Sequence, residues 1–188
     1  MARLPYVDPA TAPERVRETL ERLPVPLNIF RMVAHAETAF PEFMRLGGAI
    51  LGRLELAPRL RELVILRVAK LSPSIYEWTQ HVPIGKATGV TDEQIAALER
   101  GDAAAPCFDE TDRLVLRFVD EAVRDVKVSD ATFAAAAARF SRREVVELLL
   151  TVGFYMMVAR LLESTAVDVD PPSGTAITDS IRRTLERS

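Results

Sequence analysis

Hydrophobic positions along this chain recur every three or four residues, the pattern of helices that each bury one face. Period-two alternation bounded by hairpin turns, which marks half-buried strands, is nearly absent. A hydroxyl three residues before Glu or Gln marks a helix start, because the two side chains can satisfy exposed backbone donors reciprocally. Such pairs begin at Thr11, Thr91 and Ser141. The sequence therefore predicts an all-α fold.

Further helices follow from the same periodicity, with Gly89, Gly101 and the region around Pro106 between some of them. They are predicted over residues 28–36, 37–51, 58–71, 74–88, 109–126 and 130–140. The segment from Val145 to Leu162 differs, because its side chains are nearly all apolar and leave almost no polar face. Such a helix is buried on most sides. In a chain of 188 residues another subunit can supply part of that cover, which is a first indication of oligomerisation.

The C-terminal end departs from this pattern. We expect one domain over residues 1–170, followed by a linker and a helical tail over residues 171–188. Two consecutive prolines mark the linker, and the apolar residues of the tail are Ile177, Ile181 and Leu185. The tail either docks on a neighbouring subunit or frays as a free terminus.

Composition and charge limit the class of protein. Hydrophobic residues make up 48% and charged residues 27% of the chain, which is typical of soluble globular proteins. The net charge is -3 and basic residues are scattered among acidic ones, so nucleic acid is not an expected partner. Cys107 is the single cysteine, which excludes an intrachain disulfide. The uncharged run 148–159 is shorter than the ~20 residues that span a bilayer. We expect a cytoplasmic protein without a membrane partner.

Two predicted helices carry polar side chains on apolar faces. Glu62 shares a stripe with apolar residues, which is an expensive place for an unpaired charge. On the next helix Ser74, Glu77, Trp78 and His81 fall on one face. An antiparallel hairpin of the two helices would bring Glu62 near His81. A carboxylate fixes the tautomer of an imidazole and raises its basicity, which suits a general base.

Simpler readings of the same residues stay open. Glu77 and His81 can form an ordinary pair one helical turn apart. A metal site built from Glu62, Glu77 and His81 is chemically possible, but three ligands at unknown distances support it weakly, and we expect no metal. His35 lies at a helix boundary without comparable partners, which favours a structural role. Cys107 has no neighbouring Cys or His to lower its pKa, which favours an inert thiol.

Several segments resemble the carboxymuconolactone decarboxylase family within the AhpD-like superfamily. The most specific is Tyr-Glu-Trp-Thr-Gln-His-Val at residues 76–82, preceded by Arg-Glu-Leu-Val-Ile-Leu at 61–66. The resemblance extends over roughly residues 4–169 and includes the segments 27–31, 89–95 and 153–162. It implies an all-α fold in which a helical hairpin carries the site, assembled as a homotrimer or homohexamer.

The resemblance does not imply one reaction. The AhpD-type alkylhydroperoxidases carry a Cys-x-x-Cys-x-x-x-His motif, with an upstream Glu and the His forming a proton relay. Glu62 and His81 match that relay, whereas Ser74 and Glu77 stand where the two cysteines would be. A hydroxyl and a carboxylate cannot exchange disulfides. We therefore expect no peroxidase activity by that route.

The decarboxylases of the family share a Glu four residues before the His, as Glu77 and His81 are here. This resemblance implies that His81 is the general acid or base, that Glu62 orients it and that Glu77 is a second acid/base group. The predicted substrate-binding residues are Ser74, Tyr76, Trp78 and Arg31, with Arg160 as an alternative cation for an anionic substrate. The aromatic residues near the site favour a hydrophobic or aromatic ligand; they are Phe30, Tyr76, Trp78 and Phe154.

The predicted function is that of a cofactor-free lyase or isomerase, which acts on an aromatic-derived or lactone carboxylate. Three alternatives remain. The first is an AhpD-type peroxidase, and the second is hydroperoxide chemistry at Cys107 alone. The third is an oligomeric binding protein without catalysis, whose Glu62, Glu77 and His81 would form a satisfied network with no cavity beside them.

Overall fold

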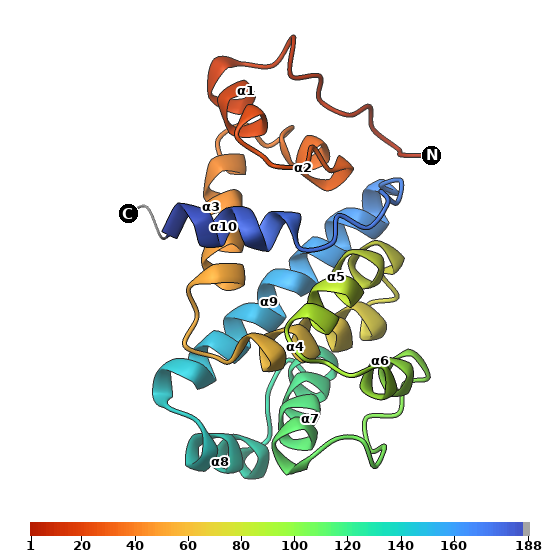
Figure 1. Ribbon diagram of the computed structural model, residues 1–188, viewed down its shortest axis with the longest axis vertical. Helices are drawn as coiled ribbons and strands as arrows, with labels where there is room; N and C mark the ends of the chain where they lie inside the picture. Colours follow the sequence, from red (N-terminus) through yellow and green to blue (C-terminus); the bar gives the residue numbers. More distant parts are fainter. Residues whose placement is uncertain (186–188) are drawn as a thin grey trace.

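A computed structural model describes residues 1–185 of the chain, and within them every regular element is a helix (Figure 1). The predicted all-α fold is confirmed. The helices are α1 (Glu14–Glu21), α2 (Asn28–Val33), α3 (Phe40–Gly52), α4 (Pro58–Leu71), α5 (Ile75–Ala87), α6 (Asp92–Glu99), α7 (Glu110–Arg124), α8 (Asp130–Arg139), α9 (Arg142–Thr165) and α10 (Ala176–Leu185).

Helix α4 is the centre of the core. It packs against α5, α7 and α9, and every residue from Leu60 to Ala69 is buried. Only a helix surrounded by other helices can bury all of its faces. Polar side chains on α4 must therefore find partners inside the protein.

Helix α9 crosses the molecule beside α4 and is buried along one side (Figure 1). It is long and apolar enough to cross a membrane by length and composition, but 56% of its most apolar window is buried inside the fold. The opposite side exposes apolar residues, so the prediction of burial on most sides is only partly right within one chain. These residues are Val146, Leu149, Leu150 and Met157.

Two of the three predicted capping boxes are present. Thr91 and Ser141 each accept a hydrogen bond from the backbone three residues later, and Gln94 and Glu144 return it. The prediction at Thr11 is wrong: Pro13 precedes the first helical residue, and the Thr11 hydroxyl donates to the Asp8 carbonyl oxygen instead. The helix starts two residues later than predicted, beyond the reach of a Thr11 cap.

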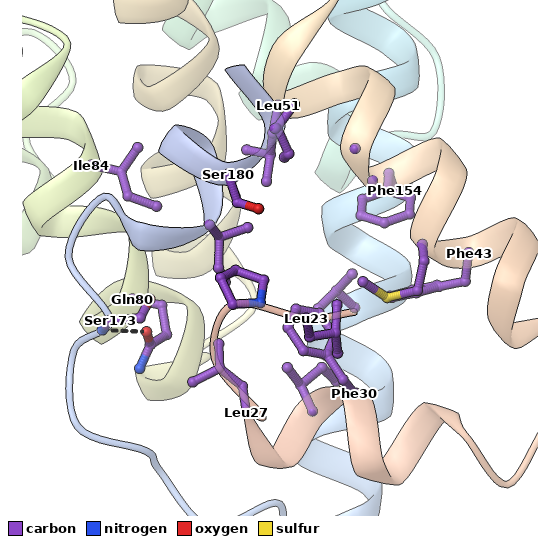
Figure 2. Close-up of a pocket in the computed structure, with 18 of the residues that line it drawn as sticks. Leu23, Leu27, Phe30, Phe43, Leu51, Gln80, Ile84, Phe154, Ser173 and Ser180 are labelled. Atoms are coloured by element: carbon purple, nitrogen blue, oxygen red, sulfur yellow. Dashed lines mark hydrogen bonds between the residues drawn. The ribbon is translucent and has the colours of Figure 1, made fainter. Parts of the chain in front are cut away.

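The C-terminal tail folds back on its own chain. Helix α10 packs against α3, and the segment before it runs along α5, where the Ser173 backbone amide donates to the Gln80 side chain (Figure 2). The tail is therefore neither a frayed end nor free to dock elsewhere over its described length. Ile177 and Ile181 both face a cavity inside the protein, whereas the side chain of Leu185 lies outside the described residues.

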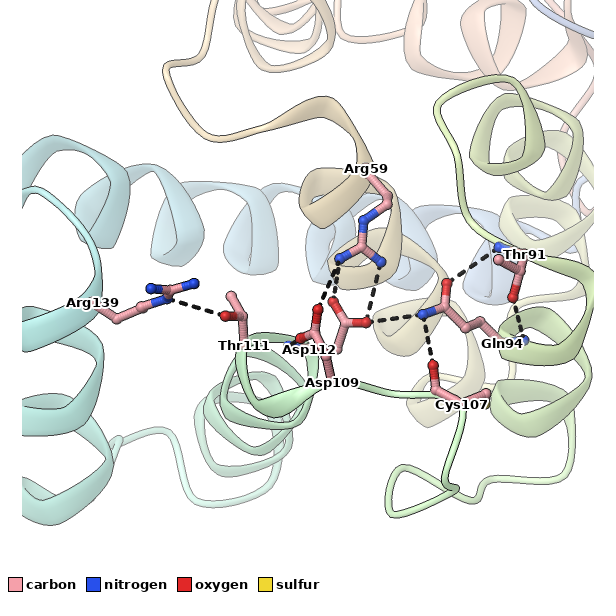
Figure 3. A network of polar contacts seen from close by, with 8 residues as sticks. All are labelled: Arg59, Thr91, Gln94, Cys107, Asp109, Thr111, Asp112 and Arg139. Carbon is pink, nitrogen blue, oxygen red and sulfur yellow. Dashed lines mark hydrogen bonds and ion pairs between the residues drawn. The ribbon is translucent and has the colours of Figure 1, made fainter.

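A buried polar network joins the starts of α4, α6 and α7 (Figure 3). Asp112 is 1% exposed and accepts from Arg59 Nη2 at 2.5 Å and from Gln94 Nε2 at 2.9 Å. Gln94 Nε2 also donates to the carbonyl oxygen of Cys107 at 3.1 Å. The network fixes the loop before α7 against the start of α4.

Candidate active site

The α4–α5 hairpin brings a carboxylate and an imidazole into contact. Glu62 Oε2 lies 2.9 Å from His81 Nδ1, and both side chains are buried. The predicted proximity of these two residues is confirmed. The turn between the helices contains Pro73, whose φ is 21°, and α5 continues through Pro83 without ending.

Arg61 completes this arrangement and was not predicted. Its Nε donates to Glu62 Oε1 at 2.9 Å, and its Nη1 donates to the Leu51 carbonyl oxygen at 2.7 Å. Consecutive residues of a helix do not normally face each other, so spacing gave no reason to pair them. A buried carboxylate is costly unless it is paired, and Arg61 supplies that pairing from the same helix.

The contact with Glu62 determines the tautomer of His81. A carboxylate accepts hydrogen bonds, so Nδ1 carries a proton, and in the neutral form of the ring Nε2 keeps a free electron pair. Within residues 1–185 no side chain hydrogen-bonds to Nε2. The ring of Tyr155 meets the imidazole edge to face, with centroids 4.9 Å apart and an interplanar angle of 89°. His81 is thus an oriented base with one unoccupied nitrogen.

Glu77 lies one helical turn before His81 and is in a different electrostatic state. The residue is 2% exposed, and neither carboxyl oxygen has a hydrogen-bond partner among the described residues. Burial raises the pKa of Glu77 well above its ordinary value, and the negative charge of Glu163 adds to this effect. Burial therefore favours the protonated form of Glu77, a carboxylic acid that can donate a proton.

Both residues border a cavity of about 390 Å³, which is the size of a typical small-molecule site (Figure 2). Tyr76, Glu77, Gln80, His81 and Ile84 form its wall on α5. The remaining wall is mostly apolar and comes from α2, α3, α9 and the C-terminal tail; it includes Leu27, Phe30, Phe43, Leu51, Phe154, Tyr155, Ile177 and Ile181. The hypothesis of a satisfied network without a cavity is wrong.

The structure separates the predicted substrate-binding residues. Tyr76 lines the cavity, although its hydroxyl donates to Asp170 and burial raises its pKa. Trp78 does not; it lies in a separate surface depression with Pro83 and Lys86. The Ser74 hydroxyl is buried without a partner, but Ser74 is not part of the cavity wall.

The predicted arginines are also misplaced. Arg31 Nε donates to the Val7 carbonyl oxygen, and its guanidinium lies 5.2 Å from the centre of the Tyr6 ring. Arg160 is exposed and donates to the Met156 carbonyl oxygen. Neither lines the cavity, because each is occupied by backbone and aromatic partners elsewhere.

Sequence reasoning missed two groups at the cavity. Tyr155 was read as one more apolar position of α9, and nothing in the sequence distinguished its hydroxyl. Burial raises its pKa well above the ordinary value, with further contributions from Glu62 and Glu77, so it stays protonated. Arg53 lines the cavity and has no carboxylate partner within residues 1–185. The only feature of the sequence that could have pointed to Arg53 is its position at the end of α3.

The structure gives no geometric support to a metal site or to chemistry at Cys107. The described residues contain no group of three or more His, Cys, Asp or Glu side chains arranged to hold a metal ion. Cys107 is half-buried in the loop before α7 and is not part of the cavity wall. His35 Nε2 lies 2.7 Å from the Pro5 carbonyl oxygen, which is a structural contact outside the cavity.

A sequence model described as the carboxymuconolactone decarboxylase family matches residues 38–121, which contain Glu62, Glu77 and His81. The resemblance of the chain to this family is confirmed over these residues. Among curated proteins no sequence matches the chain.

Solved structures show that the fold of the chain is AhpD-like. An uncharacterised peroxidase-related protein from Ralstonia eutropha JMP134, described as an alkylhydroperoxidase AhpD core, superposes with a TM-score of 0.78 at 17% identity, over 90% of this chain and 92% of that chain. A peroxidase-related protein from Silicibacter sp. TM1040 gives 0.75 at 18% identity, again over 90% and 92%. A debrominase in complex with 2,3,4-tribromopyrrole gives 0.71 at 15% identity, over 97% of this chain and 95% of that chain.

Proposed function

We propose that this protein is an acid/base lyase or isomerase that acts on an aromatic-derived or lactone carboxylate without a cofactor. One observation carries the proposal: an imidazole oriented by a carboxylate and a carboxyl group without a hydrogen-bond partner among the described residues border the same largely apolar cavity. An oriented base beside a carboxylic acid whose pKa is raised by burial is a usual arrangement for proton transfer.

The free Nε2 of His81 is the base in this proposal. Glu62 orients the ring and stabilises the imidazolium that forms when Nε2 takes a proton from substrate. Glu77 is the acid: in a decarboxylation, the electron pair left on carbon after CO2 departs accepts the Glu77 proton. In an isomerisation, Nε2 removes a proton at one carbon and Glu77 supplies one at another.

Arg53 is the best-placed cation for the substrate carboxylate. Two other arginines at the cavity, Arg22 and Arg45, are paired with Glu18 and Glu42. Arg53 is free of such a partner among residues 1–185. A free guanidinium binds a carboxylate through two parallel hydrogen bonds, which would hold the reacting carbon at a defined depth.

Thiol chemistry is a weaker alternative for this chain. Disulfide exchange needs two cysteines, and this chain has only Cys107, away from the cavity. The similarity to the peroxidase-related proteins and the debrominase therefore supports a shared fold rather than the same reaction.

A homotrimer or homohexamer is proposed as the assembled form. The exposed apolar side chains of α9 recur at helical spacing along one face and favour burial against a second copy of the chain; they are Val146, Leu149, Leu150 and Met157. Light scattering coupled to size exclusion would give the mass. A monomer at micromolar concentration would contradict the proposed assembly.

The test is turnover by wild type and single variants on γ-lactone carboxylates and aromatic ring-cleavage products. CO2 release and deuterium incorporation from D2O are followed, with organic hydroperoxide plus dithiol as a separate arm. His81→Gln and Glu77→Gln should each lower kcat by about 10²-fold or more, the usual contribution of one acid/base group. His35→Gln changes the other histidine, outside the cavity, and should keep wild-type rates. Equal turnover by His81→Gln, or no turnover by folded wild type, would refute the proposal.

A further inference from the structure

A segment of the C-terminal region, residues 168–175, links α9 to α10; we call it the strap. It follows α5 along the side that carries Tyr76 and Gln80, and α10 then crosses α3 (Figures 1 and 2). Ser173 of the strap is part of the cavity wall. The cavity is thus closed partly by residues about ninety positions away from the hairpin in sequence.

Two sets of hydrogen bonds hold the strap. The Asp170 carboxylate accepts from the Asn28 backbone amide at 2.7 Å and from the Tyr76 hydroxyl. Gln80 Nε2 donates to the carbonyl oxygens of Asp170 and Pro171 at 3.0 and 3.1 Å, and Gln80 Oε1 accepts from the Ser173 amide at 3.0 Å. Gln80 is only 5% exposed, so its amide is fully committed to the strap.

The Ser173 hydroxyl has no such partner. Its oxygen is shielded from solvent and makes no hydrogen bond within residues 1–185, although its backbone amide is held 3.0 Å from Gln80. A buried hydroxyl without a partner costs stability, and such a group in a native protein requires an explanation. The Ser74 hydroxyl is also unpartnered, but it does not border the cavity. Among the hydroxyl groups of the described residues, only that of Ser173 combines a missing partner with a place in the cavity wall, where the carboxyl group of Glu77 is likewise unpartnered.

We propose that Ser173 is a ligand-binding residue and that Gln80 positions it. The ligand is an apolar, ring-sized molecule with a neutral or carbonyl-type oxygen on the edge that faces the strap. A serine hydroxyl both donates and accepts, so it recognises a hydroxyl or a carbonyl equally, without the charge preference of an arginine. This inference rests on the proposed function, because it assumes that the cavity holds the substrate. It adds a polar contact from the strap to the contacts proposed for Arg53 and for the acid/base pair on α5.

The test uses two probes of equal shape, 2-naphthol and 2-methylnaphthalene, in calorimetric titrations of the full chain. Ser173→Ala should weaken the binding of 2-naphthol by about five- to tenfold, which corresponds to one hydrogen bond. It should change the affinity for 2-methylnaphthalene by less than about twofold. Ser164→Ala is the matched control, since Ser164 is exposed on α9 and outside the cavity. It should leave both affinities unchanged.

The outcomes separate the two proposals. Equal affinities of Ser173→Ala and wild type for 2-naphthol overturn the role of Ser173 and leave the proposed function standing. A parallel loss for both probes also overturns it, because a damaged cavity affects the methyl probe equally. Failure of wild type to bind either probe overturns the proposed use of the cavity and this inference together.

Gln80→Met tests the positioning role. Methionine keeps the length of the side chain but removes all three hydrogen bonds to the strap. We expect faster amide exchange over residues 168–175, unchanged exchange in α7, and the same selective loss of 2-naphthol affinity as in Ser173→Ala. Unchanged exchange in the strap, or unchanged 2-naphthol affinity with a loosened strap, would show that Gln80 does not position Ser173.

Discussion

Replacing Glu77 by Leu should stabilise the protein and abolish the proposed chemistry. Glu77 is 2% exposed, both of its carboxyl oxygens lack partners among the described residues, and burial raises its pKa. A residue kept in that state reduces the stability of the fold. Enzymes commonly accept such a loss at positions needed for catalysis.

The magnitude follows from the two unpartnered oxygens. In proteins, burial of a polar group without a hydrogen bond costs about 1–3 kcal/mol. Leucine is similar in size and would meet the apolar cavity wall formed by residues such as Ile84 and Phe154. For a chain of this size, each kcal/mol shifts Tm by about 2–4 °C, so Glu77→Leu should raise Tm by about 2–12 °C.

The pH dependence has a definite sign. Because the pKa of Glu77 is raised in the folded state, that state holds a proton which the unfolded state releases above its ordinary pKa of 4.5. Wild-type stability therefore falls as pH rises above about 4.5, over the range up to the raised pKa. The advantage of Glu77→Leu should be smallest below pH 4.5 and should grow toward neutral pH.

Thermal melts of wild type and variant at a series of pH values measure this difference. Glu147→Leu is the control, because Glu147 is also buried but accepts from the Leu56 amide at 2.8 Å and from Arg143 at 2.8 Å. Its removal leaves those donors unpaired and should lower Tm. A lower Tm for Glu77→Leu as well, or a stability difference independent of pH, would refute the reasoning.

Two further predictions concern the helices around the site. Gly48→Ala should stabilise the protein by about 1 kcal/mol, because the added Cβ in α3 meets open space. Gly47→Ala should stabilise it less or destabilise it, because the added Cβ would lie 3.1 Å from Phe154. Denaturant unfolding measures both variants, and equal gains in the free energy of unfolding would contradict the packing argument. Ser141→Ala should lower the free energy of unfolding by about 1 kcal/mol, because it removes a helix cap, whereas Thr11→Ala should change it little. Equal losses of stability in chemical denaturation would show that the cap contact is not the cause.

The local part of the site could be predicted from the sequence. Glu62 and His81 lie about equally far from the turn that joins their helices, so a hairpin of consecutive helices pairs them whatever surrounds it. Helix starts at Thr91 and Ser141 depend on contacts three residues apart and were equally accessible. These features involve only neighbouring elements.

The misplacement of Trp78 shows where such reasoning fails. The cavity takes the face of α5 that carries Tyr76, Glu77, Gln80 and His81. At ~100° per residue, Trp78 points about 130° away from the middle of that face. Sequence spacing gave Glu77 and Trp78 equal claims to share a face with His81. Packing against α9 and the tail decided between them, and those contacts join residues far apart in the sequence, such as Gln80 and Asp170 or His81 and Tyr155.

The replacement of two cysteines by Ser74 and Glu77 changes what this hairpin can do. Paired thiols need to approach each other and move electrons, so both must lie at the same reactive surface. In this chain only Glu77 borders the cavity, while Ser74 is buried behind it. Residue 77, the position nearer His81, therefore keeps its access to a ligand. Burial against the apolar wall would raise the pKa of a cysteine at this position and favour the neutral thiol, and it raises the pKa of Glu77 and favours the neutral carboxylic acid in the same way. The same desolvation thus favours proton donation by Glu77, and the base that accepts protons, His81, was already in place.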